Sequence, residues 1–211
     1  MNAERIATSY RWLEYAAFGF ALEHARFDFL SHARDARRVL ILGEGDGRFL
    51  ARLVECNRHA RVAVVESSAR MIQLARRRVP VSAAPRVEFH QMDVAAQPLP
   101  AGPFDLAVTH FFLDILTPGD AEALICKVSA LLSPRANWMV SEFQEPCGQV
   151  RGLHARLWLA AMYGFFRVSA GLGVSKLPPY RDLLRRYGLT EIEHRERRLG
   201  LIRSQVWRKQ L

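Results

Sequence analysis

The chain has 211 residues, half of them hydrophobic and 24% charged, which suits one α/β domain of ordinary globular composition. It contains no run of 18 apolar residues, so we expect no transmembrane helix. Its first residues, Met-Asn-Ala-Glu-Arg, lack the apolar core of a signal peptide, so we expect a cytoplasmic location.

The net charge of +9 is of the kind that nucleic-acid-binding proteins carry. Only Lys127, Lys176 and Lys209 among the 30 basic residues are lysines, a bias that a GC-rich genome can produce by itself. The basic residues are also dispersed, with no aromatic-interleaved stripe. Solvated faces are therefore favoured, and a nucleic-acid partner is kept as the alternative.

Residues 3–32 have apolar positions at helical spacing, with Gly19 as a candidate break between two helices. Strands and helices then alternate, which predicts a parallel sheet covered by helices on both faces. The expected strands are 38–43, 61–66, 86–91, 104–109 and 137–143, and the expected helices are 47–57, 68–78 and 119–132. A turn is predicted at Ser133-Pro134-Arg135, just before the fifth strand.

The pattern changes after Pro146. Residues 149–170 form an apolar, aromatic helical segment, and a second helix begins at Pro178-Pro179-Tyr180 and ends at Gly188. The last segments, 189–197 and 201–208, read as an antiparallel pair because the connection around Gly200 is short.

The most informative stretch is an apolar strand that runs directly into three alternating glycines, Gly43, Gly45 and Gly47, followed by a helix. Glycines let the backbone turn sharply and lie close to a ligand, and a strand–loop–helix unit presents N–H groups to a nucleotide-like molecule. The G-x-G-x-G spacing matches neither a dinucleotide loop nor a P-loop.

Polar residues follow the other strands where they end. Glu66 closes the second strand, about 20 residues beyond the glycine loop, where an acid can accept hydrogen bonds from a ribose. Met92 and Asp93 follow the third strand, and Thr109 and His110 end the fourth.

In this order, residues 36–145 resemble the class I S-adenosylmethionine-dependent methyltransferases. The resemblance implies a Rossmann-like, seven-stranded, mostly parallel sheet with an antiparallel last strand, helices on both faces and an N-terminal helical lid. One domain would then fill 1–211, with the lid at 1–35, the cofactor core at 36–145, a helical insertion that caps the substrate at 146–187 and the closing strand pair at 188–211.

The resemblance also implies roles for individual residues. The glycine loop would pass under the methionine part of S-adenosylmethionine, Glu66 would hold the ribose, and Asp93 would contact the adenine amine with Met92 beside the ring. Thr109, at the end of the fourth strand, is also a candidate cofactor-binding residue. Ile41 stands where the family usually has an acid that helps to hold the methionine amino group, and Glu44 could partly substitute for it.

Methyl transfer from a sulfonium requires the acceptor to be positioned next to the methyl group, and it does not require a catalytic residue. His110 is nevertheless a candidate base because of its place at the end of the fourth strand, with Asp114 to orient it or to act itself; loop packing and helix capping are the structural alternatives. Candidate substrate-lining residues, which could equally be core residues, are Tyr10, Glu142, His154, Trp158 and Tyr163.

No cysteine pair or metal-ligand spacing appears, so no metal is expected. The segments after the fifth strand loosely resemble the ubiquinone/menaquinone methyltransferase group, and the aromatic segment suits a small, apolar or aromatic acceptor, although it suits a homodimer interface nearly as well. The product would be S-adenosylhomocysteine. The alternatives are an RNA methyltransferase, indicated by the charge, and a non-catalytic cofactor-binding protein, indicated by Ile41.

Overall fold

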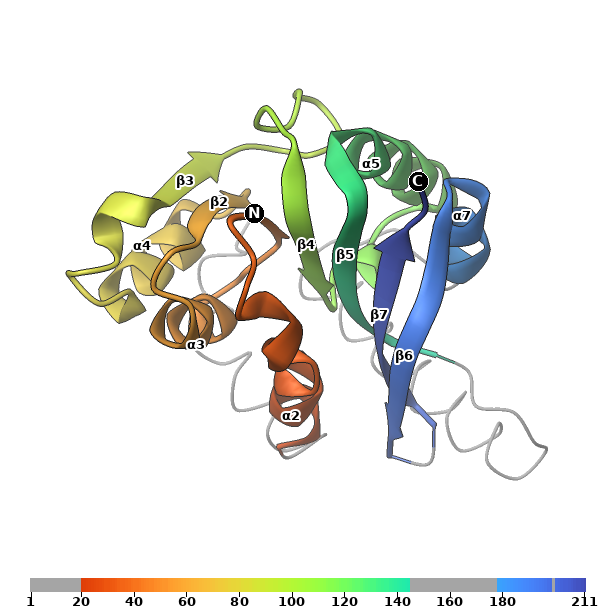
Figure 1. The fold of residues 1–211 in the computed structure, drawn as a ribbon, viewed down its shortest axis with the longest axis horizontal. Helices are drawn as coiled ribbons and strands as arrows, with labels where there is room; N and C mark the ends of the chain where they lie inside the picture. Colours follow the sequence, from red (N-terminus) through yellow and green to blue (C-terminus); the bar gives the residue numbers. More distant parts are fainter. Residues whose placement is uncertain (1–19, 145–177, 199) are drawn as a thin grey trace.

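The computed structural model describes residues 20–144, 178–198 and 200–211. These residues form a seven-stranded sheet in the order β3-β2-β1-β4-β5-β7-β6 (Figure 1), as expected for a Rossmann-like fold. The strands are β1 (Arg38–Leu42), β2 (Arg61–Glu66), β3 (Val87–Gln91), β4 (Phe104–His110), β5 (Leu132–Phe143), β6 (Leu189–Arg197) and β7 (Ile202–Lys209). Most of the expected lid and insertion lies outside the described residues.

The first five strands are parallel, and β7 runs antiparallel to both β5 and β6. The tight connection between β6 and β7 includes Gly200 at φ 86°. The predicted antiparallel pair at the end of the chain is therefore confirmed.

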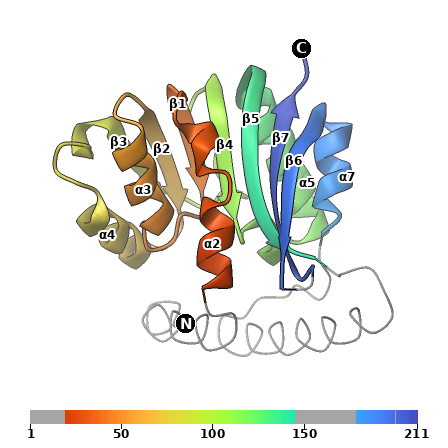
Figure 2. The same cartoon turned by 60° about the horizontal axis from the view of Figure 1, so that its bottom comes forward.

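Helices cover both faces of the sheet (Figure 2). They are α2 (Ala21–Phe27), α3 (Arg48–Cys56), α4 (Ala69–Arg78), α5 (Pro118–Leu131) and α7 (Tyr180–Arg186), with short 3-10 turns η1 (Leu30–Ala33), η2 (Ala84–Arg86) and η3 (Leu113–Ile115). Two helix starts have side-chain caps: Ser68 accepts from the Met71 N–H, and Thr117, just before Pro118, accepts from the Asp120 N–H.

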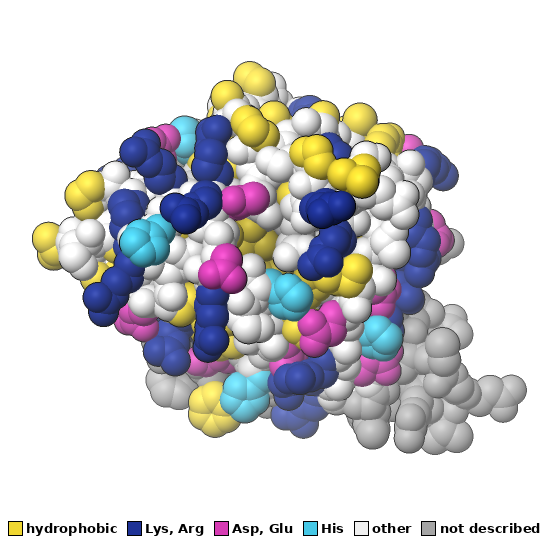
Figure 3. Space-filling model, in the orientation of Figure 1, with side chains coloured by type: hydrophobic (Ala, Val, Ile, Leu, Met, Phe, Trp, Pro, Cys, Tyr) yellow, Lys and Arg dark blue, Asp and Glu magenta, His cyan; other side chains and the backbone are white. Residues whose placement is uncertain are grey.

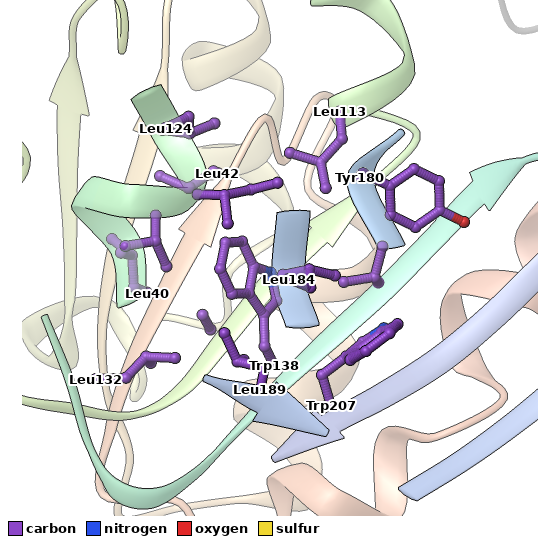
Figure 4. Close-up of a cluster of buried hydrophobic side chains, with 14 of the residues drawn as sticks. Leu40, Leu42, Leu113, Leu124, Leu132, Trp138, Tyr180, Leu184, Leu189 and Trp207 are labelled. Carbon is purple, nitrogen blue, oxygen red and sulfur yellow. The ribbon is translucent and has the colours of Figure 1, made fainter. Parts of the chain in front are cut away.

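Two hydrophobic cores lie on opposite faces of the sheet because alternate side chains of a strand point in opposite directions. Leu40 and Leu42 pack with Trp138, Trp207 and the apolar side of α5 and α7 (Figure 4). Val39 and Ile41 pack instead with residues of α3 and η1. Burial on both faces explains why β1 reads as a continuous apolar run.

The strand β5 differs from the prediction. It begins at Leu132 rather than residue 137, so the predicted turn lies within the strand. Its pairing with β4 shifts between Phe104↔Leu132 and Leu106↔Asn137, which leaves extra residues on β5, and Arg135 has a φ of 62° there. The turn residues are accommodated as an irregularity in the ladder rather than as a break before it.

None of the helices among the described residues is both long and apolar enough to span a bilayer.

Candidate active site

The glycine loop joins β1 to α3, and all three of its glycines have positive φ, at 67° for Gly43, 68° for Gly45 and 88° for Gly47. A Cβ added to Gly43 would lie 2.2 Å from Cδ2 of Phe112, and one added to Gly47 would lie 2.5 Å from Cα of Ala75. A Cβ on Gly45 would meet nothing within 4 Å among the described residues. The middle of the loop therefore borders open space, as a ligand cradle requires.

The side chain of Glu66 connects the end of β2 to this loop. One carboxylate oxygen accepts the Gly45 N–H at 3.2 Å, and the other accepts the Ser68 N–H at 2.9 Å. Each oxygen keeps a further lone pair for a hydroxyl donor. The sequence placed these two features about 20 residues apart, and the structure brings them into direct contact.

The segment after β3 runs beside the end of β2, since the Met92 N–H donates to the Glu66 carbonyl at 3.2 Å. Met92 is partly buried against the core, whereas Asp93 is exposed and accepts the Ala95 N–H through Oδ1 at 2.9 Å. The predicted cofactor residues Glu66, Met92 and Asp93 therefore line up along one edge of the sheet.

His110, at the end of β4, lies edge-to-face with Phe49, and its Nδ1 is 2.9 Å from the Ser141 hydroxyl. That hydroxyl donates its single proton to the Ala25 carbonyl, so Nδ1 must carry the ring proton and donate. Ser141, not Asp114, therefore orients the ring. Nε2 is buried and has no hydrogen-bond partner among the described residues.

Burial, and then the nearby Arg26 guanidinium, lower the pKa of His110 to about 3. The imidazole is consequently neutral at physiological pH and has little affinity for a proton. This environment favours a hydrogen-bond acceptor over a general base.

Asp114 and Glu142 lie side by side on the other face of the sheet. Glu142, a candidate substrate-lining residue, has no exposed surface, and its oxygens accept backbone N–H groups of residues 112–114. Burial raises the pKa of Asp114 to about 6, and burial together with the Asp114 charge raises the pKa of Glu142 well above its ordinary value.

Glu44 and Thr109 have structural partners. Glu44 accepts the Leu50 N–H at 2.9 Å, within the first turn of α3, and burial raises its pKa to about 8. Thr109 is fully buried and its hydroxyl accepts from the Trp138 indole N–H at 3.0 Å, so its side chain faces the core rather than the loop. The candidates Tyr10, His154, Trp158 and Tyr163 lie outside the described residues.

Comparison with known proteins agrees with this geometry. Residues 39–135 match the model of a methyltransferase domain family. The chain is 31% identical over 179 residues to trans-aconitate 2-methyltransferase of Azoarcus sp. (strain BH72). The aligned region covers 81% of this chain but only 65% of that protein.

Solved structures show the same fold at low sequence identity. N-methyltransferase NodS from Bradyrhizobium japonicum WM9 superposes with a TM-score of 0.63 at 15% identity, covering 90% of this chain and 97% of that one. An O-methyltransferase family protein from Burkholderia thailandensis gives a TM-score of 0.70 at 19% identity, covering 98% of this chain and 62% of that one.

Residues 39–135 thus form a methyltransferase domain, and the fold is that of the class I S-adenosylmethionine-dependent methyltransferases.

The residues of this domain fit S-adenosylmethionine on structural grounds. The open space over Gly45, the fixed carboxylate of Glu66 and the exposed carboxylate of Asp93 follow one another along the carboxyl edge of β1, β2 and β3. This is the edge where α/β folds bind nucleotides.

A separate hollow of about 380 Å³ lies at the opposite edge, lined by residues that include His32, Asp105 and Asn137. It lies near the amino ends of the strands, so we do not associate it with the cofactor. Within the described residues, no three His, Cys, Asp or Glu side chains are grouped so that they could hold a metal ion.

Two residues of the candidate site, Phe112 and Arg26, are not indicated by the sequence. Phe112 packs against Gly43, and the Arg26 guanidinium lies 5.2 Å from the centre of the Phe111 ring. Both contacts join distant segments, so no local pattern could have indicated them.

Proposed function

We propose that this protein transfers a methyl group from S-adenosylmethionine to a small-molecule acceptor. The observation that carries the proposal is the contact between the Gly45 N–H and the Glu66 carboxylate, because it joins the methionine and ribose positions expected for the family in one site. When bound, the sulfonium would supply an activated methyl group: the acceptor's nucleophile would attack the methyl carbon in line as the carbon–sulfur bond breaks, and S-adenosylhomocysteine would leave.

In this proposal the chain's own residues bind and position. Backbone groups of Gly43, Gly45 and Gly47 lie under the methionine part, Glu66 accepts from the ribose, and Asp93 accepts from the adenine amine with Met92 beside the ring. Thr109 is left out because its side chain is in the core.

The acceptor is proposed to be small, and apolar or aromatic according to the sequence of the segment 146–187. The name of the relative from Azoarcus adds trans-aconitate, a small but highly charged tricarboxylate, as a second kind of acceptor to test beside the apolar ones. An RNA acceptor and cofactor binding without turnover are the competing proposals, the first motivated by the charge and the second by Ile41.

Calorimetric titration with S-adenosylhomocysteine tests the cofactor site. We expect micromolar binding by the wild type and none by Gly45→Arg or Glu66→Ala, since these changes fill the open space or remove the ribose acceptor. A wild type that binds no S-adenosylhomocysteine would contradict the proposal.

Methyl transfer with labelled cofactor then tests the acceptor. Trans-aconitate, quinone-like compounds and transfer RNA should be compared in one assay, and labelling of RNA alone would exclude a small acceptor. Binding without transfer to any of them would favour the non-catalytic alternative.

We further propose that His110 is a positioning residue that acts as a neutral hydrogen-bond acceptor, and that it is not the base that removes a proton from the methyl acceptor. His110→Asn should therefore lower kcat by less than about tenfold, whereas loss of a general base costs about 10²–10⁴-fold. The comparison is made at saturating acceptor over a range of pH, and a loss above about 100-fold would restore His110 as a base.

A further inference from the structure

A buried carboxyl pair lies beneath the segment that follows β4. Glu142 is the next-to-last residue of β5 and has no exposed surface, and Asp114 is the middle residue of η3 with 3% of its surface exposed. Neither is required as a proton acceptor by the proposed transfer. Their contacts suggest a different use.

Glu142 caps η3 from a neighbouring strand. One of its oxygens accepts the N–H groups of Phe112 at 3.2 Å and Leu113 at 2.9 Å, and the other accepts the Asp114 N–H at 3.3 Å. The free N–H groups at the start of a helix usually find a short polar side chain nearby, but Phe112 occupies the N-cap position and cannot supply one. Glu142 provides the missing acceptor.

The segment that Glu142 holds forms a wall of the glycine loop. The Phe112 ring lies so close to Gly43 that a Cβ there would be 2.2 Å from the ring. The preceding residue, Phe111, has a φ of 54° and packs its ring 5.2 Å from that of Phe143. A shift of the backbone at 112–114 would therefore move a surface that the glycine loop packs against.

The two buried carboxyl groups are neighbours, since the Asp114 N–H itself donates to a Glu142 oxygen at 3.3 Å and the Asp114 charge acts on Glu142. Two carboxylates in contact repel strongly when both are charged, so such a pair normally keeps one proton between them. Burial raises the pKa of both Asp114 and Glu142, which likewise favours keeping a proton on the pair.

The charged and titratable groups around the pair do not neutralise it. Tyr180 of α7 faces Glu142, and its hydroxyl accepts from the Gln205 amide at 2.8 Å; Figure 4 shows Tyr180 and Leu113 in the same buried cluster. Arg203 is the cross-strand partner of Glu142, but its guanidinium donates to Glu191 and Glu196. Within the described part of the chain, no basic side chain hydrogen-bonds to either carboxyl group.

We propose that Asp114 and Glu142 are a positioning pair for the methyl transfer: one shared proton keeps Glu142 in place as the cap of η3, and the cap holds Phe112 against the glycine loop. Loss of that proton at alkaline pH makes both groups charged, displaces the 112–114 segment and weakens cofactor binding. The effect on the cofactor rests on the proposed function, whereas the effect on the segment does not.

The test compares the wild type with Glu142→Gln and Asp114→Asn as the pH is raised from neutral into the alkaline range, the direction that removes the shared proton. Each amide can donate to the remaining carboxylate and has no proton to lose, so each variant keeps a donor between the two groups at every pH. Asp114→Asn is the closer imitation of the singly protonated pair, because the amide nitrogen in Glu142→Gln cannot accept the Asp114 N–H that Glu142 Oε2 accepts. Asp105→Asn is the matched control, because the Asp105 carboxylate also accepts two backbone N–H groups, those of Arg37 and Arg38, but at the opposite edge of the sheet.

Two quantities are measured: the amide-exchange protection factor of Leu113, corrected for the intrinsic effect of pH, and the affinity for S-adenosylhomocysteine. We expect both to fall about tenfold at the higher pH in the wild type and in Asp105→Asn, and by less than about twofold in the other two variants. Titration of the ligand's own amino group affects all four proteins alike, so only the difference between them counts.

The proposal is overturned if Glu142→Gln and Asp114→Asn lose protection at alkaline pH as the wild type does. It is also overturned if Leu113 protection in the wild type does not change, or if Glu142→Gln weakens binding at neutral pH as much as Glu142→Ala. Failure of the wild type to bind S-adenosylhomocysteine would contradict the proposed function, while the Leu113 measurement would still decide on the pair.

Discussion

At the scale of single residues, the glycines of the cofactor loop are required for different reasons. Gly43 and Gly47 combine positive φ with a close neighbour, the Phe112 ring and the Ala75 backbone respectively. Gly45 has a similar φ but open space beside it. Backbone conformation therefore acts alone at Gly45 and together with packing at the other two.

Replacing Gly45 with Ala should destabilise the protein by about 1–2 kcal/mol, the cost of a left-handed residue with a Cβ. Gly43→Ala should cost roughly 1–3 kcal/mol more, because the methyl group also collides with Phe112. Urea unfolding of both variants measures the difference. Equal losses would show that Phe112 moves aside freely.

Glu44 should make stability depend on pH. Burial raises the pKa of Glu44 in the folded protein to about 8, from an ordinary value of 4.5, so its protonated form is stabilised by folding. This contribution is complete below about pH 4.5 and is lost as the pH rises through about 8. His110 acts in the opposite sense: its contribution is present above about pH 6.5 and is lost as the pH falls toward 3.

Glu44→Gln keeps an acceptor for the Leu50 N–H but cannot ionise, so the variant should lose less stability than the wild type between about pH 5 and pH 8. One proton can contribute at most about 1.4 kcal/mol per pH unit, and partial exposure of Glu44 reduces this value. Thermal unfolding across that range measures the slope. Parallel curves for the two proteins would mean that Glu44 ionises normally.

At the scale of elements, Asn57 holds the start of two strands together. Its side-chain amide donates to the carbonyls of Ala33 and Ala36, both at 2.7 Å, and its carbonyl accepts the N–H groups of His59 and Ala60, both at 2.9 Å. This buried residue therefore joins the end of α3 to the segments that lead into β1 and β2.

Asn57→Asp should destabilise the protein by about 2–4 kcal/mol, because the carboxylate faces two carbonyl groups and leaves them without donors. Asn137→Ala is the matched control: it removes an amide that contacts Arg208 at the surface and should cost less than about 0.5 kcal/mol. Chemical denaturation compares the two. A small loss for Asn57→Asp would contradict the joining role.

At the scale of the whole molecule, the chain has a net charge of +9, but several of its basic side chains lie in ion pairs. Asp28 binds Arg195 and Arg197, and Asp46 binds Arg48 and Arg78. Figure 3 shows acidic side chains among the basic ones over one face of the molecule. These four arginines thus have local carboxylate partners, as expected for solvated faces rather than for a phosphate-binding stripe.

Binding to transfer RNA should therefore be weak, in the non-specific range of about 10⁻⁴–10⁻⁶ M at physiological salt, and should lack sequence preference. Electrophoretic or fluorescence titrations at several salt concentrations measure it. Nanomolar binding that survives physiological salt would instead support the RNA methyltransferase.

The sequence by itself determined the order of strands and helices, the glycine loop and the acids at the strand ends, because these depend on residues close together in the chain. Apolar runs such as 39–42 are buried on both faces wherever they lie in a parallel sheet, and the short connection around Gly200 leaves little choice but a hairpin. These features also carried the likeness to the family.

Only the tertiary structure decided how the site is supported. Glu142 meets the N–H groups of residues 112–114 across 28 to 30 positions of sequence, and Thr109 meets Trp138 across 29. Such contacts depend on the register between β4 and β5, and the irregular start of β5 lies in that same pairing. A local pattern specifies a strand, but the neighbour of each side chain is specified by how the strands pair.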